Sequence, residues 1–260
     1  MKRVLGCIRR ADERYRMIHP GDKVCVGVSG GKDSLLLLYG LKLYQKFCHT
    51  PFELIGVMLD LGISDQDYQP VADFAESIGV PFEILKTDIG DVVFNIRQES
   101  HPCALCAKMR RGALHNALRE HGITKIALGH HFDDVIETIL MSMLYGAQVN
   151  TMMPKLHSTN FEGMELIRPL YLVKEADILA WKDYNHLRFL QCACRFTEAA
   201  ARENEEEKSK RQEMKKLIAG FRKTNPYIET NIFKSVENVN LDACIGYVKH
   251  GERHNFLEEY

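Results

Sequence analysis

The chain has 260 residues, with 34 basic and 35 acidic side chains and a formal net charge of −1. Its 45% hydrophobic and 27% charged content is that of an ordinary soluble protein, and no apolar run approaches the roughly 20 residues of a membrane span. This length holds one large α/β domain with a small appendage, and the net charge gives no global case for nucleic-acid binding. We expect a cytoplasmic protein that does not contact a membrane.

Positive charge gathers near the two ends of the chain. Residues 1–25 carry seven basic and three acidic side chains, and residues 208–223 carry seven basic and one acidic. Two basic segments on a near-neutral body suit a polyanion that touches one face of the protein. Two solvated helix faces explain the same pattern, so both interpretations stay open. Residues 1–20 are predicted to form a short basic helix.

A glycine-rich turn between a strand and a helix follows. Val24, Val26 and Val28 are β-branched and apolar, as a buried strand requires. Residues 35–38 are four leucines that are predicted to begin a helix. Glycines let the backbone approach a ligand closely, and a helix N-terminus attracts anions. The turn differs from a Walker A loop, which has four residues between its glycines. We predict a phosphate-binding loop made by Ser29, Gly30, Gly31, Lys32, Asp33 and Ser34.

Strand and helix patterns follow one another from residue 52 to residue 221. Strands are predicted at 52–59, 81–85 and 126–128, and helices at 70–78, 108–121, 135–144, 174–185 and 197–221. This order predicts an α/β fold with a doubly wound parallel sheet, helices on both of its faces and a helical C-terminal extension. The expected limits are 1–20 for the basic helix, 21–195 for the catalytic domain and 196–260 for the extension.

Polar residues stand where two of these strands end. Asp60 follows the second strand, and Gly129, His130, His131, Asp133 and Asp134 follow the fourth. Open α/β sheets bind ligands at the carboxyl ends of their strands, so we expect these residues beside the phosphate loop. One of the two histidines is expected to be packed under the sheet edge, and Asp133 is an alternative N-cap of the following helix.

The cysteines form two clusters of short spacing. Cys103 and Cys106 make a C-x-x-C pair, predicted on a turn before a basic helix, and Cys192 and Cys194 stand 86 or more residues later. Thiolates at such spacing bind zinc or an iron–sulfur cluster, or form a redox pair, and all three options remain open. Cys25, inside the first strand, is expected to be a core residue.

Six groups of residues occur in a characteristic order. They are Ser29 to Ser34, Cys103 to Cys106 with Met109 to Gly112, Lys125 to His131, Asp133 with Asp134, Tyr145 and Gly146 with Met153 to Leu156, and Cys192 to Cys194. Together they resemble the tRNA 2-thiocytidine synthetase family, the iron–sulfur branch of the PP-loop tRNA thiolases, over residues 20 to 240. This chain differs from the family pattern in its second cysteine pair, which is C-x-C, and in its compact N-terminal region.

The resemblance implies a Rossmann-like PP-loop ATP pyrophosphatase fold and an ATP-dependent tRNA sulfurtransferase. Such enzymes bind ATP and Mg²⁺, adenylate the C2 oxygen of a cytidine at tRNA position 32, and replace that oxygen with sulfur carried on a 4Fe–4S cluster. AMP and pyrophosphate are released, and the product is 2-thiocytidine. The sulfur donor is expected to be a cysteine desulfurase or inorganic sulfide, and a homodimer is one option for assembly.

The family's roles carry over to named residues of this chain. The resemblance implies cluster ligands at Cys103, Cys106 and Cys194, with Cys192 as the alternative third ligand. From their charge and position beside the loop we expect Lys32 and Asp134 to be catalytic, and the phosphate loop, Asp60, Arg110 and Gly129 to bind the nucleotide. A solvated helix residue is the alternative for Arg110. The competing hypotheses are a PP-loop thiolase acting on uridine, a cluster-containing PP-loop enzyme that does not act on tRNA, and a zinc- or cluster-stabilised RNA-binding protein without catalysis.

Overall fold

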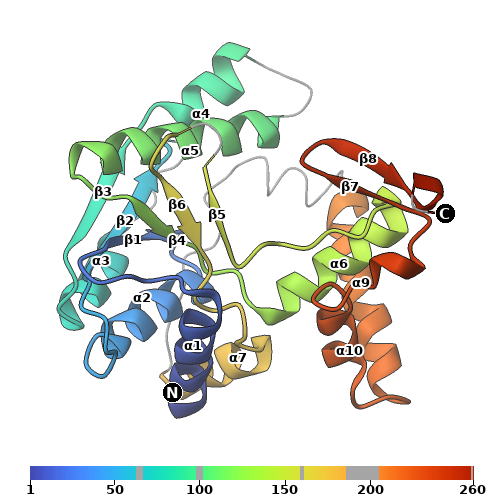
Figure 1. The fold of residues 1–260 in the computed structure, drawn as a ribbon. Coiled ribbons are helices and arrows are strands. Elements are labelled where there is room, and N and C mark those ends of the chain that lie inside the picture. Colours follow the sequence, from blue (N-terminus) through green and yellow to red (C-terminus); the bar gives the residue numbers. More distant parts are fainter. Residues whose placement is uncertain (63–66, 98–101, 159–160, 186–204, 259) are drawn as a thin grey trace. The chain divides into compact units, whose positions relative to one another are not determined.

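The computed structural model describes residues 1–62, 67–97, 102–158, 161–185, 205–258 and 260. Contacts divide the chain into two compact units (Figure 1). The first unit comprises Met1–Val135 and Met153–Lys208, and the second comprises Ile136–Met152 and Ser209–Tyr260.

The first unit is built on a six-stranded sheet with the order β3-β2-β1-β4-β6-β5. All neighbouring strands are parallel except β5, which pairs antiparallel with β6 at the edge. The central strand β1 is nearly all buried, as its β-branched sequence requires. The strands are β1 (Lys23–Val28), β2 (Glu53–Asp60), β3 (Phe82–Lys86), β4 (Lys125–Ala127), β5 (Lys155–His157) and β6 (Glu165–Ile167).

Helices cover both faces of this sheet. In Figure 1, α1, α2 and α7 gather on one side of it and α5 lies on the other. Leu35 to Leu38 of α2 are all buried, because α2 is enclosed between the sheet and its neighbours α1 and α7. The helices of this unit are α1 (Lys2–Tyr15), α2 (Lys32–Tyr44), α3 (Gln69–Ser77), α4 (Ile89–Asp91), the π-helical turns Val92–Arg97, α5 (Pro102–Glu120) and α7 (Glu175–Tyr184).

The second unit holds most of α6 (Phe132–Gly146) and α9 (Glu205–Arg222), with α10 (Ile228–Ser235). A small antiparallel hairpin of β7 (Gly246–Lys249) and β8 (Glu252–Asn255) follows, flanked by the 3₁₀ turns Leu241–Ala243 and Phe256–Glu258. Met214, Ile218 and Phe233 are its buried apolar side chains from α9 and α10. None of the described helices of the protein is both long enough and apolar enough to cross a membrane.

The predicted doubly wound sheet is confirmed, and the structure corrects three details. Strands β5 and β6 were not predicted, and β5 adds an antiparallel edge to the sheet. The C-terminal region contains the β7–β8 hairpin besides its helices. Helix α5 begins at Pro102 rather than near residue 108, so the C-x-x-C pair lies on a helix and not on a turn. Ala104, Leu105, Ala107 and Lys108 are good helix formers, and proline suits the first helical position, which explains the early start.

Candidate functional site

The phosphate loop lies at the topological switch point of the sheet, where the strand order reverses between β1 and β4. Strands β2 and β3 extend from β1 on one side, and β4, β6 and β5 extend on the other. The turns that follow β1 and β4 are therefore neighbours at the carboxyl edge, which is where open α/β sheets bind ligands. A Cβ atom on Gly129 would lie 3.0 Å from the carbonyl carbon of Asp33 and 3.1 Å from the amide nitrogen of Ser34. Glycine at this position lets the turn after β4 touch the start of α2.

Two serine hydroxyls hold the phosphate loop in shape. The Ser34 hydroxyl donates to the carbonyl oxygen of Gly31 over 3.0 Å and accepts from the Ser29 amide over 3.2 Å. The hydroxyls of Ser29 and Ser34 are 3.2 Å apart. Gly30 has a φ of +77°, a left-handed conformation that favours glycine. The loop leads directly into the first turn of α2, whose amides have no helical acceptor and attract anions.

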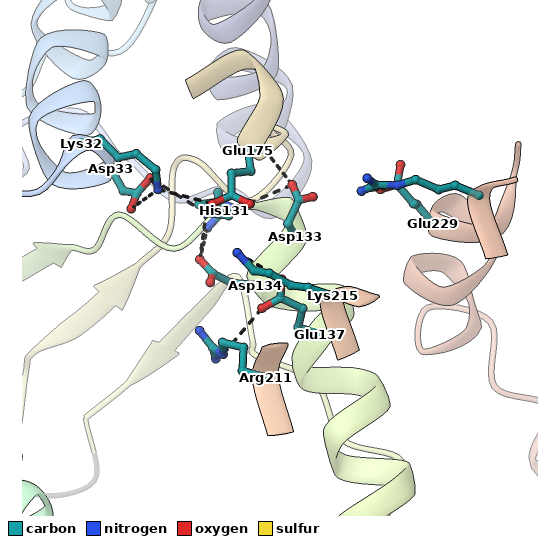
Figure 2. A network of polar contacts seen from close by, with 11 residues as sticks. Lys32, Asp33, His131, Asp133, Asp134, Glu137, Glu175, Arg211, Lys215 and Glu229 are labelled. Atoms are coloured by element: carbon teal, nitrogen blue, oxygen red, sulfur yellow. Dashed lines mark hydrogen bonds and ion pairs between the residues drawn. The ribbon is translucent and has the colours of Figure 1, made fainter. Parts of the chain in front are cut away.

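A network of charged side chains surrounds the loop (Figure 2). The Lys32 ammonium lies 3.0 Å from Asp33 Oδ1 and 3.5 Å from Glu175 Oε1. The buried imidazole of His131 places its Nε2 3.5 Å from Asp134 Oδ2 and 3.9 Å from Asp33 Oδ1. One lysine and three carboxylates from the starts of α2, α6 and α7 therefore meet at one edge of the sheet. The position of His131 confirms that one histidine of the pair is packed under the sheet edge.

The two adjacent aspartates at the start of α6 have different structural roles. Asp134 Oδ2 accepts a hydrogen bond from the His131 amide over 3.0 Å, which caps α6. Asp133 Oδ2 accepts from the Glu175 amide over 2.7 Å, which fixes the first turn of α7. The alternative that Asp133 is the N-cap of its own helix is thus wrong, because α6 begins at Phe132 and the Asp133 carboxylate reaches α7 instead.

Asp60 stands at the same edge of the sheet, beside the phosphate loop. Met58 of β2 is in register with Val28 of β1, so Asp60 lies beyond the end of β1. Its Oδ1 accepts from the Gly62 amide over 3.0 Å and from the Tyr68 hydroxyl over 3.4 Å. Burial and the Asp60 carboxylate together raise the pKa of Tyr68, which stays a protonated donor at neutral pH.

The first cysteine pair and Arg110 share helix α5. Cys103 and Cys106 are three residues apart, a spacing that puts them on one face of a helix. Cys106 is buried against Leu61, Ile89 and Val93, and Arg110 is exposed one turn further on. Cys192 and Cys194 lie outside the described residues. Within the described ranges, no group of three or more His, Cys, Asp or Glu side chains is arranged to hold a metal ion.

The residues present are chemically compatible with a nucleotide. A glycine turn, a helix N-terminus and the Lys32 ammonium are groups that attract phosphate. The carboxylates of Asp33 and Asp134, which both approach the imidazole of His131, are oxygen ligands of the kind that Mg²⁺ prefers.

Glu175 is the residue of this network that the sequence did not reveal. Its carboxylate pairs with Lys32 and its amide binds Asp133. An acidic residue in the first turn of a helix is common for electrostatic reasons alone, so no local pattern distinguishes Glu175.

Arg211, Lys215 and Arg222 of the basic stretch 208–223 each pair with a carboxylate of the second unit. Glu137, 1% exposed, places its carboxylate oxygens 3.6 Å from Arg211 Nε and 3.8 Å from Lys215 Nζ (Figure 2). Arg222 forms a salt bridge with Glu229. These pairs support the interpretation of this segment as a structural helix face more than as a polyanion site.

A family model and curated relatives indicate one family for this chain, and a solved structure shares its fold. Residues 7–203 match the model of a PP-loop domain. A tRNA-cytidine(32) 2-sulfurtransferase of Nitrosospira multiformis is 35% identical over 256 residues, which cover 96% of this chain and 82% of the relative. One from Coxiella burnetii is 33% identical, with 99% and 96% covered. The fold also matches a U34-tRNA thiolase of Methanococcus maripaludis solved with its 4Fe–4S cluster, with a TM-score of 0.67, 23% identity, and 89% of this chain and 76% of that one covered.

Proposed function

We propose that this chain, which belongs to the family of PP-loop tRNA-cytidine(32) 2-sulfurtransferases, uses ATP to replace the C2 oxygen of cytidine 32 in tRNA with sulfur. The observation that carries the proposal is the phosphate loop at the switch point of the sheet, with a lysine, a buried histidine and carboxylates from three helices around it.

The residues at the loop can support the first half of the reaction. The C2 oxygen of cytidine attacks the α-phosphate of ATP, and pyrophosphate leaves. Negative charge grows on the departing pyrophosphate, and Lys32 with the first-turn amides of α2 lies where it can stabilise that charge. Lys32 already contacts both Asp33 and Glu175, so its ammonium is held at the loop before ATP arrives.

Carboxylates at the same edge supply the expected site for Mg²⁺. Asp33 and Asp134 both approach the buried imidazole of His131, and Asp60 lies at the neighbouring strand end. When bound, Mg²⁺ would neutralise phosphate charge during adenylation. Gly129 lets the turn after β4 pack against the start of α2 beside the expected phosphate site. We assign Arg110 of α5 to the phosphate or to AMP.

The second half of the reaction needs sulfur at the activated carbon. Sulfur adds to C2, and AMP leaves with the original oxygen, which gives 2-thiocytidine. When bound, a 4Fe–4S cluster would supply that sulfur, received from a cysteine desulfurase or from sulfide. Cys103 and Cys106 of α5 would hold it with Cys194 or, as the alternative, Cys192. Cys106 lies beside Leu61, just past the end of β2, so α5 begins near the sheet edge that carries Asp60.

Release of AMP tests the activation step. The full chain with its cluster is mixed with tRNA and ATP, and AMP is measured by chromatography. We expect Lys32→Ala and Asp33→Asn each to reduce AMP formation by at least about 100-fold, because the first removes the cation that stabilises the pyrophosphate and the second removes an expected Mg²⁺ ligand. Lys46→Ala, an exposed lysine just beyond α2, is the matched control and should leave the rate unchanged. AMP formation at the normal rate by both loop variants would contradict the proposal.

A further inference from the structure

A pocket lies on the sheet face that α5 covers, away from α2. Its volume is about 550 Å³, and it is enclosed by α5 and strands β4, β5 and β6. This volume is within the range of small-ligand pockets in proteins. All of its lining residues belong to the first unit.

One wall of this pocket carries a buried cation without a counter-charge. Arg168, which follows β6, is 8% exposed, and its guanidinium donates to the carbonyl oxygen of Met153. Its Nε has no hydrogen-bond partner, and no carboxylate among the described residues pairs with it. Burial lowers the pKa of Arg168 from its very high usual value, yet arginine stays charged at neutral pH. A buried cation without an anion is unfavourable, so the site favours an anionic ligand.

Two more cations from α5 line the same pocket. Lys108 and Arg111 are exposed, and neither forms an ion pair with a carboxylate in the described part of the chain. No acidic side chain is among the residues that line the pocket. The three positive charges therefore act together and attract an anion from solution.

Another part of the pocket wall is apolar. Leu156, Met164 and Leu166 line it, together with Phe161, whose ring stacks on His115 with centroids 3.8 Å apart and an angle of 13°. Burial lowers the pKa of His115, so its imidazole is neutral at neutral pH and adds no charge. A ligand that suits this pocket has an anionic group at one end and an apolar, planar group at the other.

We propose that this pocket binds one nucleotide of the RNA substrate, with its phosphate at Lys108, Arg111 and Arg168 and its base against the apolar wall. The proposal rests on the proposed function, which makes tRNA the substrate. RNA-binding proteins commonly hold unpaired bases on aromatic side chains and their phosphates on lysine and arginine. The pocket would fix the tRNA on the opposite face of the sheet from α2 while the reacting cytidine is at the phosphate loop.

Gly112 of α5 offers a direct test because it lines the pocket and a Cβ built on it meets no atom within 4 Å. Gly112→Ala adds one methyl group and should raise the unfolding temperature, since alanine favours a helix over glycine. Gly112→Leu should also fold, but its larger side chain occupies the pocket. The probe is a fluorescently labelled anticodon stem–loop RNA, and binding to the full chain is followed by anisotropy. We expect the alanine variant to bind like the unmodified protein and the leucine variant about tenfold more weakly.

Charge variants test the phosphate end separately. Lys108→Gln with Arg111→Gln should weaken binding and reduce the slope of log affinity against log salt by about 0.7 for each lost contact with single-stranded RNA. Lys46→Gln, an exposed lysine remote from the pocket, should change neither quantity. Normal RNA affinity in a folded Gly112→Leu variant would overturn the proposal. A second outcome would also overturn the proposal. If inorganic phosphate raises the unfolding temperature of the unmodified protein but not of Gly112→Leu, while the two proteins bind RNA equally well, the pocket holds a free anion and the RNA assignment is wrong.

The failure of this proposal can be told apart from failure of the proposed function. If the unmodified protein thiolates tRNA and Gly112→Leu binds RNA normally, the pocket assignment fails and the function stands. If Gly112→Leu loses RNA affinity and the unmodified protein forms no thiolated nucleoside, the pocket stands and the function fails.

Discussion

Asp134 combines a structural and a chemical role in one carboxylate. Its Oδ2 caps α6 through the His131 amide and faces the His131 ring at 3.5 Å. Asp134→Asn keeps an oxygen acceptor for the cap and loses the charge. We therefore expect the free energy of unfolding to change by less than about 0.5 kcal/mol, while AMP formation falls by about 100-fold.

The comparison with Asp134→Ala separates these two roles. Alanine removes the cap as well, and we expect a further loss of about 1 kcal/mol in urea unfolding with similarly low activity. An asparagine variant with normal AMP formation would show that Asp134 has only the structural role.

Cys25 of the sheet core differs from the thiols that we expect to hold the cluster. Burial, with a smaller contribution from Glu83, raises the pKa of Cys25 to about 12, so Cys25 stays protonated and is a poor ligand. We predict that alanine at Cys103, Cys106 or Cys194 lowers the iron bound per chain and abolishes thiolation. Cys25→Ala is the control and should keep its iron. The measurement is iron and sulfide content after anaerobic reconstitution.

The two downstream cysteines need a side-by-side comparison. If Cys192→Ala loses the cluster and Cys194→Ala keeps it, the third ligand is Cys192 and not Cys194. Loss in both would make four thiolate ligands and leave no open iron for sulfur, which would contradict the proposed transfer step.

At the scale of elements, one buried lysine connects the segment 16–22, between α1 and β1, to the sheet. Lys125 Nζ, at the start of β4, lies 2.8 Å from Asp22, 2.9 Å from Glu165 and 2.6 Å from the carbonyl oxygen of Met17, to which it donates. Burial acts to raise the pKa of Glu165, but the hydrogen bond and charge of Lys125 outweigh it and hold that pKa below its usual value. The network fixes the end of α1 against strands β4 and β6.

This network makes stability depend on pH in a predictable direction. Because the pKa of Glu165 is lower in the folded state, its contribution is present above the unfolded value of about 4.3 and is lost as the pH falls through the folded value. Lys125→Met should cost about 3 kcal/mol in urea unfolding at pH 7, and the difference from the unmodified protein should narrow below about pH 4. Lys155→Met also removes a partner of Glu165, but this lysine is 31% exposed and should cost less than about 1 kcal/mol. A difference that stays constant with pH would exclude Glu165 as the cause.

Helix α1 is the better candidate of the two basic segments for contact with tRNA. Arg3, Arg9, Arg10 and Arg14 of this helix are all exposed, and Arg3 and Arg9 also pair with Asp177 and Glu13. Charge reversal of Arg10 and Arg14 should weaken tRNA binding and lower its salt dependence. Lys46→Glu serves as the control for net charge. An unchanged slope of affinity against salt in the α1 variant would show that α1 is a solvated helix face that does not contact tRNA.

The sequence predicted the elements with strong local patterns and missed those that depend on distant contacts. Strands β1 to β4 and the phosphate loop follow from apolar runs and glycines. Strands β5 and β6 have three residues each, too few to show a pattern, and only their mutual pairing defines them. The β7–β8 hairpin turns at His250 and Gly251, both with positive φ, without the Asn-Gly signal that marks such turns.

At the scale of the whole molecule, a chain with a net charge of −1 is proposed to bind a polyanion through local features. The phosphate loop, helix α1 and the pocket under α5 each present positive groups, although the total charge is balanced elsewhere. Such an arrangement predicts RNA affinity that depends on a few named cations and falls steeply with salt.

The formation of 2-thiocytidine tests the central claim most directly. The full chain with a reconstituted cluster is incubated with ATP, Mg²⁺, sulfide and a tRNA that has cytidine at position 32, and the digested tRNA is analysed by mass spectrometry. We predict ATP-dependent 2-thiocytidine in an amount matched by AMP, and no thiolated product from a tRNA with another base at that position. Unmodified cytidine, or sulfur on a different nucleoside, would contradict the account.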